Sequence, residues 1–196
     1  MTPTHVFHSP RSRSTRVIWA LEELGAPYEV TRLTPEERRG AEHRTRHALG
    51  RVPVIEDDGV YLFESGAIVL ALADRHPQAG LNFPLGSRER ELVYQWVLFV
   101  MAELEPQIVA VRDARETDPP RAAAATERFG ESAALLEGAL EGHRFLVADR
   151  FSVADIMVGE VLGFARNVGL LEPFPALDAY ISALYERPGY TVASAP

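Results

Sequence analysis

The 196-residue sequence predicts an α/β domain followed by an all-α domain. In the first third of the chain, stretches of strand-type composition alternate with stretches of helical spacing. After His76-Pro77 the apolar residues recur only at helical spacing, and residues 82–86, which include Pro84, are typical of a linker. We therefore expect one domain over residues 1–80 and a second over residues 87–196.

The first domain is expected to begin with a βαβ unit. Residues 5–8 have the composition of a short strand, and the apolar residues between 17 and 24 recur at helical spacing. Gly25 is placed to end that helix. Residues 28–33 form the second strand, and a connection of this kind makes the two strands parallel with a right-handed crossover.

A helical segment, a hairpin and a closing helix are expected to complete this domain. Thr34-Pro35-Glu36-Glu37 has the cap, proline and acid of a helix start, and an Arg-rich helical segment follows to Leu49. "RVPVIEDDGVYLF" places two strand-type runs around an Asp-Gly turn, although Pro53 lacks the N–H that a strand residue donates. Residues 65–75 have helical spacing, so the predicted order is β-α-β-α-β-β-α.

The second domain is expected to contain helices over residues 92–108, 121–141, 152–168 and 176–186. Pro106 should bend the end of the first of them. In "FSVADI", Ser152 and Asp155 form a capping box with aspartate in place of glutamate. We interpret this box as a folding signal and not as chemistry, with the cap alone contributing about 1 kcal/mol.

Composition excludes several classes of function. The chain has no cysteine, which rules out disulfides, thiolate metal sites and a cysteine nucleophile. His43 and His47 are four residues apart without an evident third ligand, so no metal site is expected. The net charge of −8 argues against nucleic-acid binding, and no apolar run is long enough to span a membrane. Without the pattern of a signal peptide, a cytoplasmic location is expected.

Four segments, in this order and at this spacing, resemble the cytosolic glutathione transferases. They are "SRSTRVIWALEELGAPYE", "GRVPVIEDDG", "ESGAIV" and "FLVADRFSVADIMVG". The resemblance covers nearly the whole chain, and the Ser-Arg opening is most similar to bacterial, serine-type members. It implies a thioredoxin-like domain followed by an all-helical domain, with glutathione as co-substrate and no metal.

The resemblance implies that the enzyme activates the glutathione thiolate for attack on a small hydrophobic electrophile. Ser12 falls at the serine-class position, and its hydroxyl would donate a hydrogen bond to the sulfur, with Arg13 adding positive potential. His8 is the second choice for this role. Ser14 is also a candidate, although a residue in the first helical turn is more often solvated or capping.

Glutathione itself would be held by the middle of the first domain. In the family the bond before the proline that matches Pro53 is cis, which turns the backbone of Val52 toward the cysteinyl part of glutathione. An edge-strand proline in trans is the alternative. Glu64 would bind the γ-glutamyl ammonium of glutathione. Ser65 would both cap the helix that follows and bind the γ-glutamyl carboxylate; the alternative is that it only caps the helix.

The glycyl end and the electrophile are assigned less directly. Arg51 stands where many relatives carry a lysine near the glycine carboxylate, and His47 is either a further contact there or a surface residue. Trp96, Phe99, Val100 and Glu103 would line an electrophile site on the helical domain, but an apolar helical stripe is equally typical of core.

The resemblance also implies a homodimer, whose subunits pair the α/β domain of one with the helical domain of the other. Two alternatives to conjugation stay open. One is a glutathione-dependent isomerase, dehalogenase or peroxidase on the same scaffold, and the other is a non-catalytic, partner-binding protein of the starvation-regulator type. The sequence does not identify the electrophile.

Overall fold

The computed structural model describes residues 3–195, which form two compact units. The first unit runs to Phe83 and also takes in the segment that begins at Arg187, and the second unit is Pro84–Glu186. Within residues 3–195, no helix has the length and apolar content needed to cross a bilayer.

The first unit is built on a four-stranded sheet with the order β2-β1-β3-β4. Its strands are β1 (Thr4–His8), β2 (Tyr28–Arg32), β3 (Val54–Asp57) and β4 (Val60–Phe63). β1 and β2 are parallel, as the βαβ pattern predicted, while β3 is antiparallel to both β1 and β4. Pro53 lies just before β3, so its missing N–H removes no bond from the ladder.

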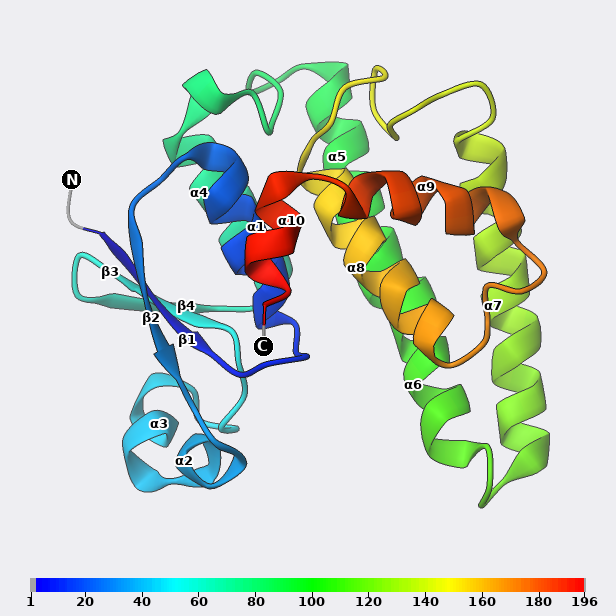
Figure 1. The fold of residues 1–196 in the computed structure, drawn as a ribbon, viewed down its shortest axis with the longest axis horizontal. Helices are drawn as coiled ribbons and strands as arrows, with labels where there is room; N and C mark the ends of the chain where they lie inside the picture. Colours follow the sequence, from blue (N-terminus) through cyan, green and yellow to red (C-terminus); the bar gives the residue numbers. More distant parts are fainter. Residues whose placement is uncertain (1–2, 196) are drawn as a thin grey trace. The chain divides into compact units, whose positions relative to one another are not determined.

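The helices of the first unit follow the predicted order. They are α1 (Ser14–Leu24), α2 (Pro35–Arg39), α3 (Ala41–Arg46), α4 (Ser65–Arg75) and a 3₁₀ turn at Pro77–Ala79. Gly25 ends α1 with a left-handed φ of 61°, and Thr34 and Glu37 form the capping box of α2. α1 and α4 lie side by side (Figure 1). This is the thioredoxin-like arrangement that the resemblance implied.

One helix of the first unit was not predicted. α10 (Pro188–Ala193) lies beyond the last predicted helix, that over residues 176–186, and it packs on α1 (Figure 1). The Arg187 guanidinium donates two hydrogen bonds to the carboxylate of Glu23, at 2.7 and 2.5 Å. The rings of Trp19 and Tyr190 meet edge-on with centroids 5.0 Å apart. These contacts across the fold attach the segment to the first unit.

The second unit is entirely helical. Its elements are α5 (Arg88–Phe99), a π-helical turn (Val100–Leu104), α6 (Glu105–Ala114), α7 (Pro119–Ala139), α8 (Val153–Asn167) and α9 (Pro175–Tyr185). Pro106, which was expected to bend the end of the first helical stretch, is the second residue of α6, and the stretch continues to Ala114. The Glu105 N–H bonds to the Val100 carbonyl five residues back, and this wider turn accommodates a proline that has no N–H for the residue four back.

α8 begins at the predicted capping box. Ser152 is the N-cap, and the Asp155 carboxylate accepts the backbone N–H of Ser152 at 2.8 Å. The same carboxylate accepts the Leu146 N–H at 3.0 Å and the Tyr180 hydroxyl at 2.7 Å. The buried Asp155 carboxylate therefore links α8 to the preceding loop and to α9 through hydrogen bonds, and its role is wider than that of a local cap.

Candidate active site

The strand register brings three segments to one edge of the sheet. Phe7 pairs with Val54, and Val54 pairs with Phe63. The residues after β1, those before β3 and those after β4 must therefore be neighbours at that edge. These are the Ser-rich start of α1, the Val-Pro pair and the Glu-Ser pair, the three segments that the resemblance assigned to glutathione.

The start of α1 holds a compact cluster of hydroxyl groups. The Ser12 hydroxyl lies 2.6 Å from the Ser9 carbonyl oxygen and 2.6 Å from the Ser14 hydroxyl. Ser14 lies in turn 2.8 Å from Nδ1 of His8. All three candidates for the thiolate contact, Ser12, Ser14 and His8, thus belong to one hydrogen-bonded chain.

Burial separates these candidates. Ser12 is half-buried, whereas Ser14 is fully buried and His8 is 2 % exposed. The expectation of a solvated or capping Ser14 is wrong, because its hydroxyl turns inward to His8. Burial, followed by the charge of Arg32, lowers the pKa of His8 and favours its neutral form. Ser12 is the member of the chain with access to a ligand, and Arg13 beside it is exposed.

The Val52–Pro53 peptide bond is cis. The Val52 side chain is buried in a core cluster with Phe7, Leu33 and Val54. Among residues 3–195, its backbone N–H and C=O have no hydrogen-bond partner. The preceding carbonyl, that of Arg51, is tied to Nε2 of buried His43 at 2.9 Å. The side chain of Val52 is anchored while its peptide groups stay available to an extended ligand.

The Glu-Ser pair differs from its expected geometry. Glu64, and not Ser65, is the N-cap of α4, and no side chain caps that helix. Ser65 is the first helical residue, and its hydroxyl accepts a hydrogen bond from the Arg16 guanidinium at 3.2 Å. Glu64 is exposed and has a φ of 70°, a left-handed backbone that a non-glycine residue rarely adopts. Among residues 3–195, the N–H groups of the first turn of α4 find no acceptor and stay open to a ligand.

Sequence reasoning did not single out Arg16. It is 2 % exposed on the buried face of α1, and its bond to Ser65 places a positive charge at the start of α4. A carboxylate at that point would meet this charge together with the free N–H groups of the helix. The signal in the sequence was an arginine within an otherwise apolar helical stripe.

Comparisons with known proteins agree with this geometry. Residues 2–74 match the family model "Glutathione S-transferase, N-terminal domain", and residues 94–188 match "Glutathione S-transferase, C-terminal domain". A sphingomonad glutathione S-transferase solved with glutathione is 31 % identical, with 97 % of this chain and 96 % of that chain covered and a TM-score of 0.87. This chain belongs to the glutathione S-transferase family.

Further relatives are bacterial and plant members of the family. BphK, a bacterial glutathione transferase solved as a ternary complex, is 28 % identical with a TM-score of 0.88, and 97 % of each chain is covered. GstA of Escherichia coli O157:H7 is 27 % identical over 93 % of each chain. Glutathione S-transferase 1 of Zea mays is 27 % identical over 89 % of this chain and 87 % of the relative.

At the expected glycyl end of a glutathione transferase site, Arg51 is exposed and His47 is not. The His47 ring packs on Phe63 with centroids 4.7 Å apart, and its Nδ1 accepts the Leu49 N–H at 3.1 Å. The alternative of a surface histidine is therefore wrong. His47 braces the loop that leads to Arg51.

The four residues assigned to the electrophile lie on α5 and the π-helical turn. Trp96 and Val100 are buried, Phe99 is half-buried against the Trp96 ring, and Glu103 is exposed. Trp96 and Val100 thus have the burial of core residues, the alternative that the sequence left open. An electrophile role for the four stays a prediction.

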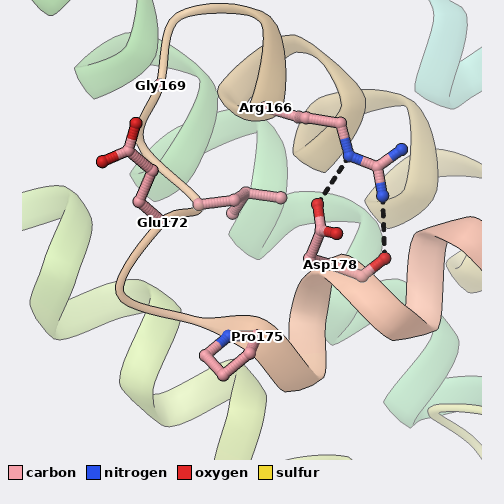
Figure 2. Close-up of a pocket in the computed structure, with 6 residues that line it drawn as sticks. Arg166, Gly169, Glu172, Pro175 and Asp178 are labelled. Carbon is pink, nitrogen blue, oxygen red and sulfur yellow. Dashed lines mark hydrogen bonds and ion pairs between the residues drawn. The ribbon is translucent and has the colours of Figure 1, made fainter.

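A cavity of about 320 Å³ lies in the helical unit, between the end of α8 and the start of α9. Figure 2 shows Arg166 directed at Asp178, where Nε donates to the carboxylate at 2.6 Å and Nη2 to the backbone carbonyl at 2.8 Å. Glu172 adds a second carboxylate to the lining. The Arg166 guanidinium is already bonded to Asp178, and the carboxylates of Glu172 and Asp178 both line the cavity. The cavity therefore does not suit an anion such as glutathione. Within residues 3–195, no three metal-ligating side chains cluster.

Proposed function

We propose that the protein binds glutathione at the edge of the sheet in its first unit and ionises the thiol for attack on a small hydrophobic electrophile. The observation that carries this proposal is the half-buried Ser12 hydroxyl just before α1. Ser12 follows β1 and the Val52–Pro53 pair precedes β3, and these two strands are paired in the sheet. Family membership supports glutathione as the co-substrate. Detoxification in the cytoplasm is the role we propose for this activity.

A single hydroxyl donor is sufficient for the chemistry. A thiol with a pKa near 8.5 is ionised to only a few per cent at pH 7, and lowering that pKa by about 2 units requires roughly 2.7 kcal/mol. One hydrogen bond to a charged acceptor provides about 1.5–3 kcal/mol, and the dipole of α1 adds to it. Serine must act as a donor and not as a base, because its own pKa is far too high.

The remaining groups of the edge match the other parts of glutathione. The free peptide groups of Val52 would pair with the cysteinyl residue as a strand does, and Arg51 would bind the glycine carboxylate. Ser65, Arg16 and the open N–H groups of α4 would hold the γ-glutamyl carboxylate. Glu64, exposed beside them, would take the ammonium group.

Binding and turnover are tested separately. Glutathione at about 100 times its dissociation constant should stabilise the protein by about 2.7 kcal/mol, which corresponds to roughly 5–10 °C in Tm. Cysteinylglycine, which lacks the γ-glutamyl group, should produce a smaller shift. An assay with a chloronitrobenzene then distinguishes a transferase from a glutathione-binding protein without turnover. No shift with millimolar glutathione would overturn the proposed binding site.

We expect Ser65→Ala to weaken glutathione binding by roughly tenfold or more, because it removes a charge-assisted bond of about 1.5–3 kcal/mol. The helix should lose no cap, since Ser65 caps nothing in α4. Ser87→Ala is the matched control, because Ser87 is a true N-cap and accepts the Arg90 N–H at 3.3 Å. Calorimetric titration should show weaker binding only for Ser65→Ala. Equal affinities in the wild type and Ser65→Ala would remove Ser65 from the site.

We also propose that the protein is a homodimer. Leu49 and Phe63 are 64 % and 46 % exposed, and both adjoin the His47 ring, so an apolar area of the first unit is available for a partner. Sedimentation at micromolar concentration is expected to give twice the chain mass of 21.7 kDa. Leu49→Glu should shift the protein toward the monomer by placing a charge in a desolvated contact. A wild type that sediments as a monomer would contradict the proposal.

A further inference from the structure

The short contacts at the start of α1 determine where the hydroxyl protons lie. The Ser9 carbonyl can only accept, so the 2.6 Å contact with Ser12 requires the Ser12 proton between the two oxygens. The 2.6 Å contact between Ser12 and Ser14 then requires the Ser14 proton. With its proton used, Ser14 must accept from His8 at 2.8 Å, so Nδ1 of His8 carries hydrogen. Other arrangements leave two oxygens 2.6 Å apart without a proton between them.

The Ser14 hydroxyl also lies 3.3 Å from the Ser9 carbonyl oxygen, but its proton could turn there only by leaving the shorter contact with Ser12. Two backbone N–H groups add to this arrangement. The Ser9 N–H points at the Ser14 oxygen at 3.3 Å, and the Ser14 N–H points at the Ser12 oxygen at 3.3 Å. Each hydroxyl therefore donates once and accepts twice, which exhausts its capacity. The chain runs from His8 through Ser14 to Ser12 and ends on a backbone carbonyl. The last proton, that of Ser12, is the one that can turn to a ligand without breaking a bond between side chains.

We propose that His8 and Ser14 are positioning residues that polarise the Ser12 hydroxyl and direct its proton to the sulfur of glutathione. A hydroxyl whose oxygen accepts hydrogen bonds becomes a stronger donor, because bonds in a chain polarise one another. Burial keeps water from competing for Ser14 and His8. The inference rests on the proposed role of Ser12 and adds two residues that do not touch glutathione.

His8 is held in place for this role. Its carbonyl accepts the Leu33 N–H at 2.8 Å, and its side chain is buried. Burial, followed by the charge of Arg32, lowers the pKa of His8 and favours the neutral ring, which can hold its one proton on Nδ1. A neutral His8 ring is sufficient, because the Ser14 oxygen needs only a hydrogen-bond donor and not a positive charge.

The first test is Ser14→Ala. We expect the pKa of the bound glutathione thiol to rise by about half a unit, which is about threefold in thiolate fraction. kcat at neutral pH should fall by a similar factor and recover at high pH, while glutathione binding at low pH should not change. Absorbance titration of the thiolate and a pH profile of kcat measure these quantities. A thiol pKa equal to that of the wild type would overturn the proposal.

A second pair of variants tests His8 without altering the helix. Asparagine can place an N–H where Nδ1 stands, whereas leucine of similar size cannot donate. We expect His8→Asn to keep the thiol pKa within about 0.2 unit of the wild type, and His8→Leu to raise it as Ser14→Ala does. Equal thiol pKa values in these two variants would overturn the role of His8, and the pair remains informative if Ser14→Ala does not fold.

The double variant Ser12→Ala/Ser14→Ala separates this inference from the proposed function. If Ser14 acts through Ser12, its removal should change the thiol pKa by less than about 0.2 unit in the Ser12→Ala background. If the effects of the two substitutions on the thiol pKa are additive, Ser14 has an independent, structural role, and the proposal that it acts through Ser12 is overturned. A single Ser12→Ala variant with an unchanged thiol pKa would instead overturn the proposed role of Ser12, and with it the positioning role of His8 and Ser14.

Discussion

Replacing Ser12 by alanine is expected to raise the pKa of the bound glutathione thiol by roughly one to two units. The loss of one hydrogen bond to a charged acceptor, about 1.5–3 kcal/mol, corresponds to this shift. At neutral pH the thiolate fraction, and with it turnover, should fall on the order of tenfold or more. Titration of the thiolate absorbance in the two complexes gives the shift directly.

The pH dependence distinguishes this chemical effect from a loss of binding. At a pH below the pKa of the bound glutathione thiol in both complexes, the thiol is protonated. The wild type and Ser12→Ala should then bind glutathione about equally well. As the pH rises through the higher thiol pKa of the variant, its turnover should partly recover. An unchanged thiol pKa with unchanged turnover would overturn the proposed role of Ser12, since Ser14 and His8 are buried.

The parts of the fold that the sequence predicted correctly are those with local causes. Gly25 ends α1 because glycine adopts a left-handed φ at low cost, and Thr34 with Glu37 starts α2 through bonds made within four residues. The parallel β1–β2 pair follows from the handedness of a βαβ connection. These signals require no knowledge of what lies across the structure.

The errors concern side chains whose partners are distant in sequence. Serine is a common N-cap residue, but the Ser65 hydroxyl accepts a hydrogen bond from Arg16, 49 residues away, and α4 has no side-chain cap. α10 lies beyond the last predicted helix, and the residue before it, Arg187, bonds to Glu23, 164 residues away. Ser14 illustrates a subtler limit. It lies in the first helical turn as expected, but strand β1 ends with a histidine that draws its hydroxyl inward.

Asp155 is where we expect the largest effect on stability. Its carboxylate is fully buried and accepts four hydrogen bonds, two on each oxygen. Oδ1 takes the Leu146 N–H and the Tyr180 hydroxyl, and Oδ2 takes the N–H and the hydroxyl of Ser152. Asp155→Ala leaves these donors without their acceptor in a buried site, at a cost of about 1–3 kcal/mol for each group that finds no other partner.

For Asp155→Ala we therefore expect a loss of roughly 3–5 kcal/mol and a fall in Tm of about 10 °C or more, measured by chemical and thermal unfolding. Asp155→Asn should also be strongly damaging despite its shape, because either orientation of the amide points its NH₂ group at a backbone N–H, that of Leu146 or of Ser152, which can only donate. Ser152→Ala, which removes the cap hydroxyl, should cost about 1 kcal/mol, and exposed Asp113→Asn still less. If Asp155→Asn is as stable as the wild type, the donors around Asp155 find other acceptors, and the link between α8, the preceding loop and α9 does not depend on the carboxylate.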